Sequence, residues 1–252
     1  MDTDKTKVMI VGSKGRMGEA LMRLAGQDPK LELISGIDKG DNVLDAIDYC
    51  QVVIEFAHHS LSGDLAKMAA DHGKAMVIGT TGHTADERKA IETAARRVPI
   101  VFAPNFSVGV NLLFYLTQIA AETLGENYDQ EIVEMHHREK LDAPSGTARR
   151  LGEILAKVSG GTYEDLALHG RHGDVGARPK RVIGMHALRG GDVVGDHTVI
   201  FSAIGERLEL AHRASSRDTF ASGALRAAPW VRIQKPGLYS MQDVLGLKRQ
   251  GS

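Results

Sequence analysis

Residues 8–26 read VMIVGSKGRMGEALMRLAG, and this stretch carries the strongest fold signal in the chain. The apolar run VMIV predicts a buried strand, and glycines then recur at Gly12, Gly15 and Gly18. The following apolar residues lie on one helical face: Met17, Ala20, Leu21, Leu24 and Ala25. Glycines at such a junction let the backbone approach a pyrophosphate, whose charge is stabilised by N–H groups at the helix N-terminus. The stretch predicts a nucleotide-binding loop, with a plain tight turn as the alternative.

The first hundred residues repeat this strand-then-helix rhythm. Apolar, β-branched runs begin near Val8, Leu31, Val52, Met76 and Ile100, at a spacing of 21 to 24 residues. Helix-compatible segments separate most of these runs, which is the βαβ pattern of a parallel sheet covered on both faces. The pattern predicts an α/β domain of the Rossmann type.

The second predicted strand ends in ISGIDKG, which places Asp38 twenty residues beyond Gly18. A carboxylate at this distance is expected to accept hydrogen bonds from the adenosine ribose of a dinucleotide. It favours NAD over NADP, because a 2′-phosphate would face a like charge. Lys39 leaves NADP open, since its ammonium group could pair with a 2′-phosphate, although it could also be a solvated loop lysine.

Two further strand ends are expected to contact the nicotinamide half of such a cofactor, because ligands of open parallel sheets bind beyond the carboxyl ends of the strands. Gly79, Thr80 and Thr81 follow the fourth run, and Ala103, Pro104, Asn105 and Phe106 follow the fifth. Either loop alone could be an ordinary turn. Their joint occurrence with the glycine loop favours a cofactor site.

After Asn105 the pattern changes. Residues 110–125 predict a long apolar helix closed by Gly125, and residues 183–188, 197–203 and 208–212 predict strands separated by turns. A second, α+β domain is therefore expected from residue 107 to residue 217, inserted between segments 1–106 and 218–252 of the first domain.

Residues 134–148, EMHHREKLDAPSGTA, place a basic cluster before a predicted helix start at Pro144 and Ser145. On a regular strand His136 and His137 would face opposite ways, so a strand end must intervene if both act. The amides of Gly146 and Thr147 fall in the first helical turn, where a carboxylate is favoured. This arrangement predicts a binding site for a small acidic molecule, flanked by histidine and Lys140. The alternative is that these side chains are ordinary structural or surface groups with no ligand.

Composition excludes several other classes of function. The 31 Lys and Arg residues balance 32 Asp and Glu residues, which argues against a nucleic-acid or anionic-membrane partner. The single cysteine, Cys50, cannot form an internal disulfide, and no apolar run is long enough for a membrane span, so a cytoplasmic protein is expected. No metal site is expected, because the histidines lack ligand spacing.

The chain resembles the 4-hydroxy-tetrahydrodipicolinate reductase (dihydrodipicolinate reductase) family of the diaminopimelate route to lysine. The resemblance rests on segments spread over nearly the whole chain: VGSKGRMG, IGTTG, APNFSVGVN, EMHHREKLDAPSGTA, IGMHALRGGDVVGDHTVIF, GERLELAHRASSRDTFASGAL and PGLYSMQDVLGL. The family fold is a Rossmann domain rejoined by the C-terminal tail, with an inserted mixed-sheet domain through which homotetramers usually assemble.

The resemblance also implies roles for individual residues. It makes His136 and Lys140 the proton-transferring groups and leaves open which is the immediate donor, while His137, Gly146 and Thr147 would bind the dicarboxylate substrate. The implied contacts to NADH or NADPH are Gly12, Ser13, Lys14, Gly15, Arg16, Met17, Asp38, Lys39, Gly79, Thr80, Thr81, Ala103, Pro104, Asn105, Phe106 and Arg217.

Two segments depart from the family pattern. Glu139 stands where a third histidine is common and is expected to moderate the positive potential beside Lys140. EFAHHS, which brings His58 and His59, replaces the usual Asp-Phe-Ser or Asp-Phe-Thr stretch. Two other functions stay open at this point: another Rossmann oxidoreductase of amino or keto acids, and a nonenzymatic NAD(H)-binding regulator.

Overall fold

The computed structural model describes residues 5–247 and divides into two compact units. The divisions fall between Val108 and Gly109 and between Ser216 and Arg217. The two ends of the chain together form the first unit, and the continuous segment 109–216 forms the second.

The first unit is built on a six-stranded parallel sheet in the order β11-β5-β4-β3-β1-β2. Its strands are β1 (Thr6–Val11), β2 (Leu31–Ile37), β3 (Val52–Glu55), β4 (Ala75–Ile78), β5 (Pro99–Phe102) and β11 (Gly237–Tyr239). The five runs expected from the sequence are thus confirmed as strands. The sixth, β11, is contributed by the C-terminal segment and pairs with β5.

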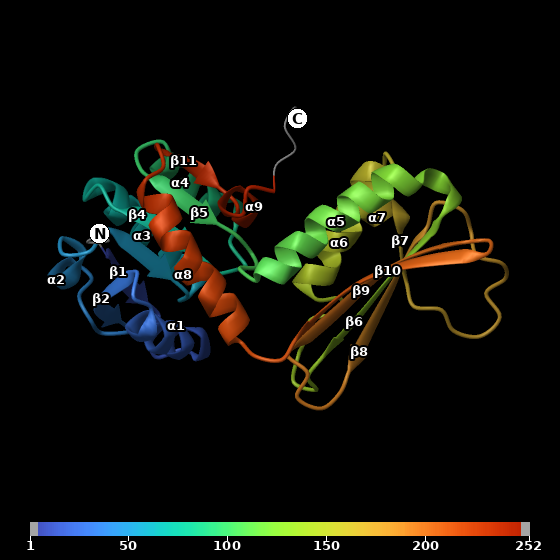
Figure 1. The fold of residues 1–252 in the computed structure, drawn as a ribbon, viewed down its shortest axis with the longest axis horizontal. Coiled ribbons are helices and arrows are strands. Elements are labelled where there is room, and N and C mark those ends of the chain that lie inside the picture. Colours follow the sequence, from blue (N-terminus) through green and yellow to red (C-terminus); the bar gives the residue numbers. More distant parts are fainter. Residues whose placement is uncertain (1–4, 248–252) are drawn as a thin grey trace. The chain divides into compact units, whose positions relative to one another are not determined.

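Helices cover both faces of this sheet because successive side chains of a strand point to opposite sides. Val8 and Ile10 share a core with α1 (Arg16–Gln27) and α8 (Asp218–Arg232), whereas Met9 and Val11 share one with α3 (His59–Asp71) and α4 (Ala85–Ala95) (Figure 1). Two four-residue helices complete the unit, α2 (Leu44–Ile47) and α9 (Met241–Val244). This is the expected Rossmann-type arrangement.

The second unit is a five-stranded mixed sheet in the order β10-β9-β6-β8-β7. The strands are β6 (Asp129–His136), β7 (Ala167–His169), β8 (Ile183–Arg189), β9 (Gly195–Ala203) and β10 (Glu206–Ala214). The central strand β6 runs antiparallel to β9 and parallel to β8. Its register sets His136 beside Arg189 of β8 and Glu134 beside His197 of β9.

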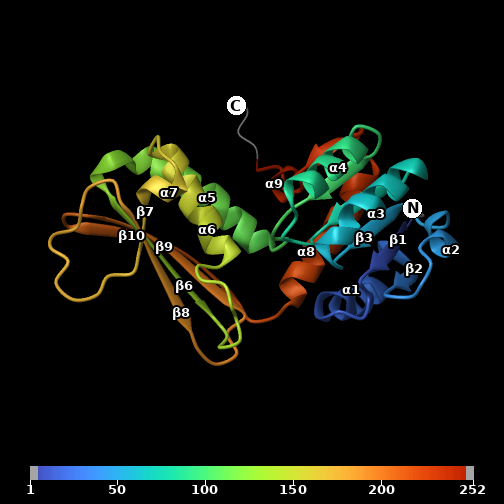
Figure 2. The same ribbon diagram turned by 180° about the vertical axis from the view of Figure 1, so that it is seen from behind.

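Three helices pack on one face of this sheet: α5 (Val108–Leu124), α6 (Gly146–Val158) and α7 (Tyr163–Leu166) (Figures 1 and 2). Their buried residues meet the inward side chains of β6, β8 and β9, including Ile132, Met185 and Phe201. The long helix expected at residues 110–125 is α5, and Gly125, with φ +65°, opens the short 3-10 turn η1 (Gly125–Asn127) after it. No helix within residues 5–247 is long and apolar enough to cross a bilayer.

Candidate active site

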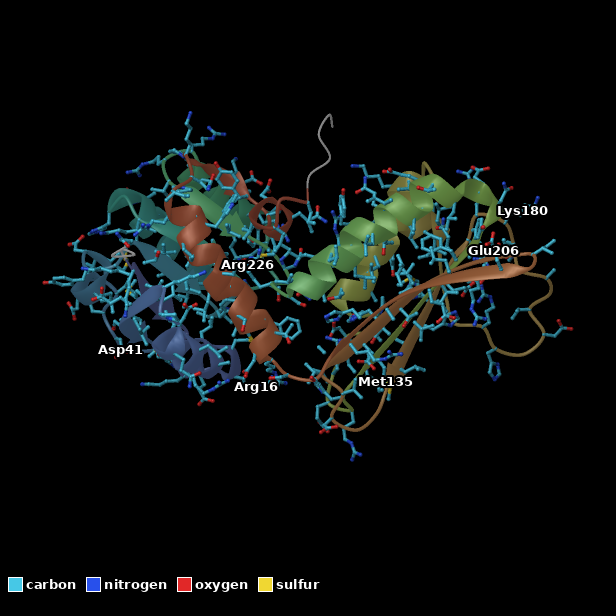
Figure 3. All side chains as sticks on the ribbon, viewed as in Figure 1. Arg16, Asp41, Met135, Lys180, Glu206 and Arg226 are labelled. Atoms are coloured by element: carbon cyan, nitrogen blue, oxygen red, sulfur yellow. The ribbon has the colours of Figure 1, made fainter. Side chains whose placement is uncertain are left out.

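The glycine loop of the first unit joins β1 to α1. Gly12 has φ +86°, and a Cβ there would overlap the carbonyl oxygen of Phe56, so only glycine fits this backbone. A Cβ on Gly18 would overlap the Gly12 carbonyl, which explains the close approach of α1 to the loop. Gly15 is the N-cap of α1 and no side chain caps the helix, so its first turn can receive an anion. Arg16, the first residue of α1, is exposed (Figure 3).

Asp38 follows β2 and is tied to the glycine loop. Its carboxylate accepts hydrogen bonds from the backbone N–H of Lys14 at 2.7 Å and of Lys39 at 2.8 Å. These two hydrogen bonds hold the pKa of Asp38 below its usual value, so the group is a carboxylate at neutral pH. The side chains of Lys14 and Lys39 are exposed beside it. Asp38 therefore lies against the glycine loop through the backbone of Lys14.

The loops after β3, β4 and β5 converge on Phe56, which sequence reasoning did not single out. Its ring covers Gly79 so closely that a Cβ there would overlap the ring, and it lies 5.7 Å from the Phe106 ring between centroids. Phe106 and Ala103 are buried, whereas Pro104 is exposed and Asn105 is partly so. The position of Phe56 immediately after β3 was the available signal.

The Thr80 hydroxyl has a hydrogen-bond partner within the first unit. It donates to Glu55, a fully buried carboxyl at the end of β3 that also accepts hydrogen bonds from Ala57 N at 2.8 Å and Ser62 Oγ at 3.1 Å. Burial raises the pKa of Glu55 above its usual value, because it outweighs these three hydrogen bonds, which lower the pKa. Thr80 therefore ties the β3 and β4 loops together, while Thr81 is exposed.

The two histidines of EFAHHS are held by local partners. His58 is the N-cap of α3, and its Nδ1 accepts a hydrogen bond from Ser60 N. His59 Nδ1 lies 3.0 Å from the Glu87 carboxylate of α4. Arg217 is the N-cap of α8, the helix that packs against α1. It therefore belongs to the same unit as the glycine loop.

A second cluster lies at the end of β6 in the second unit. His136 is the last residue of that strand and is buried, and its Nδ1 lies 2.6 Å from Glu134 Oε2. Arg189 donates to both Glu134 oxygens at 2.9 Å, and Ser145 N donates to Oε1 at 3.1 Å. Burial by itself raises the pKa of Glu134, but hydrogen bonds from His136, Arg189 and Ser145 outweigh it and lower the pKa to about 2. Glu134 is thus an ionised carboxylate in the core of the site.

His137 and Lys140 lie in the turn that follows β6. The strand end that separates the two histidines is therefore present, with His136 inside the strand and His137 beyond it. His137 N donates to Val193 O at 2.7 Å, and Lys140 N donates to His137 O at 3.1 Å. Lys140 Nζ lies 2.8 Å from Asp142 Oδ1, so the carboxylate beside it is Asp142, whereas Glu139 is exposed.

Helix α6 begins where the sequence indicated. Ser145 is its N-cap, and the Ser145 hydroxyl accepts a hydrogen bond from Ala148 N at 3.1 Å. Gly146 and Thr147 are the first two residues of the helix, where the helix dipole favours an anion. The Ser145 hydroxyl also lies 2.9 Å from His197 Nε2, and burial together with neighbouring His136 lowers the pKa of His197 to about 3, so this ring is neutral.

Sequence reasoning missed Glu134, Arg189 and His197 as members of this cluster. The i, i+2 spacing of Glu134 and His136 was a usable signal, because it places both on the same face of a strand. Arg189 and His197 depend on strand register, which no local pattern reveals. Among the described residues, no group of three or more His, Cys, Asp or Glu side chains is arranged to hold a metal ion.

Comparison with known proteins assigns the chain to a family. The model of the dihydrodipicolinate reductase N-terminus matches residues 6–106, and that of the C-terminus matches residues 109–245. The chain belongs to the dihydrodipicolinate reductase family. The boundary between the two matches falls at the division between the two units near residue 108.

Relatives in this family align over nearly the whole chain. A 4-hydroxy-tetrahydrodipicolinate reductase of Akkermansia muciniphila is 54% identical over 242 residues, covering 96% of this chain and 98% of the relative. A reductase of the same name from Syntrophus aciditrophicus is 44% identical over 265 residues, covering 96% and 99%. The solved structure of a dipicolinate-bound dihydrodipicolinate reductase from Paenisporosarcina sp. TG-14 has a TM-score of 0.78 at 22% identity, covering 95% of this chain and 98% of that one, and so shows the shared fold.

Proposed function

We propose that this member of the dihydrodipicolinate reductase family is an NAD(P)H-dependent 4-hydroxy-tetrahydrodipicolinate reductase in the diaminopimelate route to lysine. The observation that carries the proposal is the near full-length match to reductases of that name at 44% identity or more. In this proposal the domain formed by residues 1–106 and 218–252 binds the nucleotide. Residues 107–217 form the domain that binds the substrate.

The residues of the first unit fit a dinucleotide. The pyrophosphate is held by the uncapped first turn of α1, beside the close backbone approach at Gly12 and Gly18. The Asp38 carboxylate is fixed by two backbone N–H groups and retains lone pairs for ribose hydroxyls. Reduced nicotinamide, when bound, supplies the hydride. The proposed contacts are Gly12–Met17, Asp38, Lys39, Gly79–Thr81, Ala103–Phe106 and Arg217.

The cofactor preference follows from the charge at Asp38. Its lowered pKa keeps a negative charge where the 2′-phosphate of NADPH would lie, so NADH is favoured. The exposed Lys39 offers a compensating positive charge, so NADPH is also accepted. Asp38→Ala is expected to reduce the preference for NADH over NADPH. Fluorescence titration of each reduced nucleotide gives the two dissociation constants whose ratio measures this preference.

The substrate is a six-membered ring that bears two carboxylates. One carboxylate is held at the start of α6 by Gly146 and Thr147, with His137 as a further contact, and this binding orients the ring. Reduction leaves electron density on the ring that must take up a proton. His136 or Lys140 donates it, and general acid catalysis of this kind contributes about 10²- to 10⁴-fold to the rate.

The test is a spectrophotometric assay at the nicotinamide absorbance band. NADH or NADPH is mixed with the protein and with the cyclic product generated by a coupled dihydrodipicolinate synthase. The proposal expects oxidation of either nucleotide only when that product is present, and loss of most of the rate in Lys140→Ala. The control is Lys157→Ala, which removes an exposed lysine from the last turn of α6 and is expected to keep the wild-type rate. Nucleotide binding without turnover would overturn the substrate assignment and favour another dehydrogenase or a regulator.

The second sheet supports a proposal on assembly. Helices cover one of its faces, and the outward side chains of β6 and β8 on the other include the partly exposed Met135 and the exposed Leu188 (Figure 3). We infer that this face joins subunits into a homotetramer, which light scattering of the purified protein tests directly. A cytoplasmic location, and the lack of nucleic-acid or membrane partners, agree with the balanced charge and the single buried cysteine.

A further inference from the structure

The proton that links His136 to Glu134 has a defined position. Glu134 is 1% exposed, and its hydrogen-bonded environment keeps it ionised, so both of its oxygens only accept hydrogen bonds. The atom 2.6 Å from Oε2 is His136 Nδ1. Nδ1 must therefore carry a hydrogen, and in the neutral ring Nε2 is then the atom with the lone pair.

Both oxygens of Glu134 are fully used within the unit. Oε1 receives Arg189 Nη2 and Ser145 N, and Oε2 receives His136 Nδ1 and Arg189 Nη1. Two donors on each oxygen fill the acceptor capacity of a carboxylate. The His136 ring is therefore held in one orientation by a group that is itself held by two other elements, β8 and the start of α6.

The other ring nitrogen of His136 is left for a ligand. Within residues 5–247, the hydrogen bond of the His136 ring to a protein group is made through Nδ1 and not through Nε2. A Cβ on Gly195 would lie only 2.9 Å from it, so the glycine keeps space beside this atom. The neighbouring His197 ring meets His136 edge-on, with centroids 5.1 Å apart, and makes its hydrogen bond through Ser145 instead.

We propose that Glu134 is a positioning residue that keeps one proton on His136 Nδ1, so that the doubly protonated ring donates its Nε2 proton to the substrate and is left in the neutral Nδ1–H form. The same carboxylate holds Ser145 N, so it also fixes the start of the helix at which the substrate carboxylate binds. One buried group thus sets both the proton-exchanging atom and the anion site. The proposal rests on the reductase function, because it assigns the working atom of that reaction.

The first experiment reads the proton directly and needs no substrate. Protein labelled with ¹⁵N at histidine gives long-range ¹H–¹⁵N correlations from which the tautomer of each ring is read, with His136→Asn used to assign the His136 signals. We expect the wild-type His136 ring to be protonated at Nδ1 whenever it is neutral. A neutral His136 protonated at Nε2 in the wild type overturns the proposal, whether or not any variant folds and whether or not the protein is active.

The second experiment separates positioning from a general structural role. Glu134→Gln replaces one accepting oxygen with an NH₂ group, which can donate to Nδ1 and so favours the Nε2–H tautomer. We expect kcat to fall about 10- to 100-fold, within the range general acid catalysis contributes, with the nucleotide KM changed less than about twofold. In a protein that already carries His136→Asn, Glu134→Gln should lower kcat almost no further, because Glu134 acts on the reaction by positioning His136. An equal loss in both backgrounds overturns the proposal.

Two controls complete the design. Glu153→Gln changes a half-exposed carboxylate on α6 that pairs with Arg149 and Arg150, and is expected to leave kcat unchanged. Glu134→Asp draws the carboxylate back from Nδ1 by one methylene group and is expected to weaken its hold on the Nδ1 proton, so it remains informative if Glu134→Gln does not fold. An unchanged His136 tautomer together with unchanged kcat in a folded Glu134→Asp variant would count against the proposal. If the wild type lacks reductase activity, the proposed function fails, but the tautomer measurement still decides the role of Glu134.

Discussion

Glu131 on β6 provides a quantitative test of the electrostatics of the second unit. Its carboxylate accepts hydrogen bonds from Arg171, Arg178 and His186, and its side chain is 19% exposed. Burial alone raises its pKa, but hydrogen bonds from Arg171, His186 and Arg178 outweigh burial and lower the pKa from an ordinary 4.5 to about 2. Glu131→Gln removes the ionised group and retains the shape.

The size and sign of the effect follow from proton linkage. A shift from 4.5 to about 2 corresponds to about 3 kcal/mol of stability at pH 7, at about 1.4 kcal/mol per pKa unit. Because the folded-state pKa is the lower one, the unfolded state binds more protons in this range. Stability is therefore present above pH 4.5 and is lost as the pH falls towards 2. Between pH 5 and pH 3 the Glu131 contribution is expected to fall by about 2 kcal/mol.

Hydrogen exchange of peptides from β6 and β8 measures the free energy of opening of this sheet in the full chain. The difference between wild type and Glu131→Gln should be about 3 kcal/mol at pH 5 and about 1 kcal/mol at pH 3. Glu209→Gln on β10 is the matched control, since the exposed pair of Glu209 with Arg207 contributes well under about 1 kcal/mol at either pH. A wild-type-to-variant difference that stays constant or grows as the pH falls would refute the reasoning.

Three further outcomes are expected. Gly18→Ala forces a methyl group into the Gly12 carbonyl and should destabilise the first unit by about 1–3 kcal/mol. Urea unfolding followed by the fluorescence of Trp230, the single tryptophan, measures this change. An unchanged urea midpoint would contradict the close packing of Gly18 against Gly12. Gly195→Ala sets a methyl group about 2.9 Å from His136 Nε2 and should lower kcat without changing hydrogen exchange in β6, whereas wild-type kcat would argue against Nε2 as the working atom. Burial raises the pKa of Cys50 to about 11, so iodoacetamide at pH 8 should label this thiol only after the protein unfolds. The mass of the intact protein measures the labelling. Rapid labelling of the native protein would contradict the burial of Cys50.

Local patterns in the sequence were sufficient for most of the fold. Five apolar runs at regular spacing correspond to β1 to β5, and the Pro144-Ser145 signal marks the start of α6. β11 has only three residues, and it is a strand because β5 leaves an edge for it to pair with. The short elements α2 and β7 likewise carry too few residues for a periodic signal.

The candidate site was accessible to sequence reasoning only where its chemistry is local. The order His136, His137, Lys140, Gly146 can be read along the chain, as can the glycine loop. The bonds that orient these groups cannot, because the Glu134–Arg189 pair depends on the β6–β8 register and the Thr80–Glu55 bond joins two loops. These contacts are nonlocal, and tertiary packing alone decides them.

The split of the first unit between the two chain ends has a consequence for biosynthesis. Its core contains Leu225 and Val231 of α8, and its sheet includes the edge strand β11; both elements follow the second unit along the chain. The second unit is continuous from Gly109 to Ser216 and is translated in full before them. The inserted unit can therefore complete its core on the ribosome while the first unit still lacks α8 and β11, which reverses the usual N-terminal-first order of cotranslational folding.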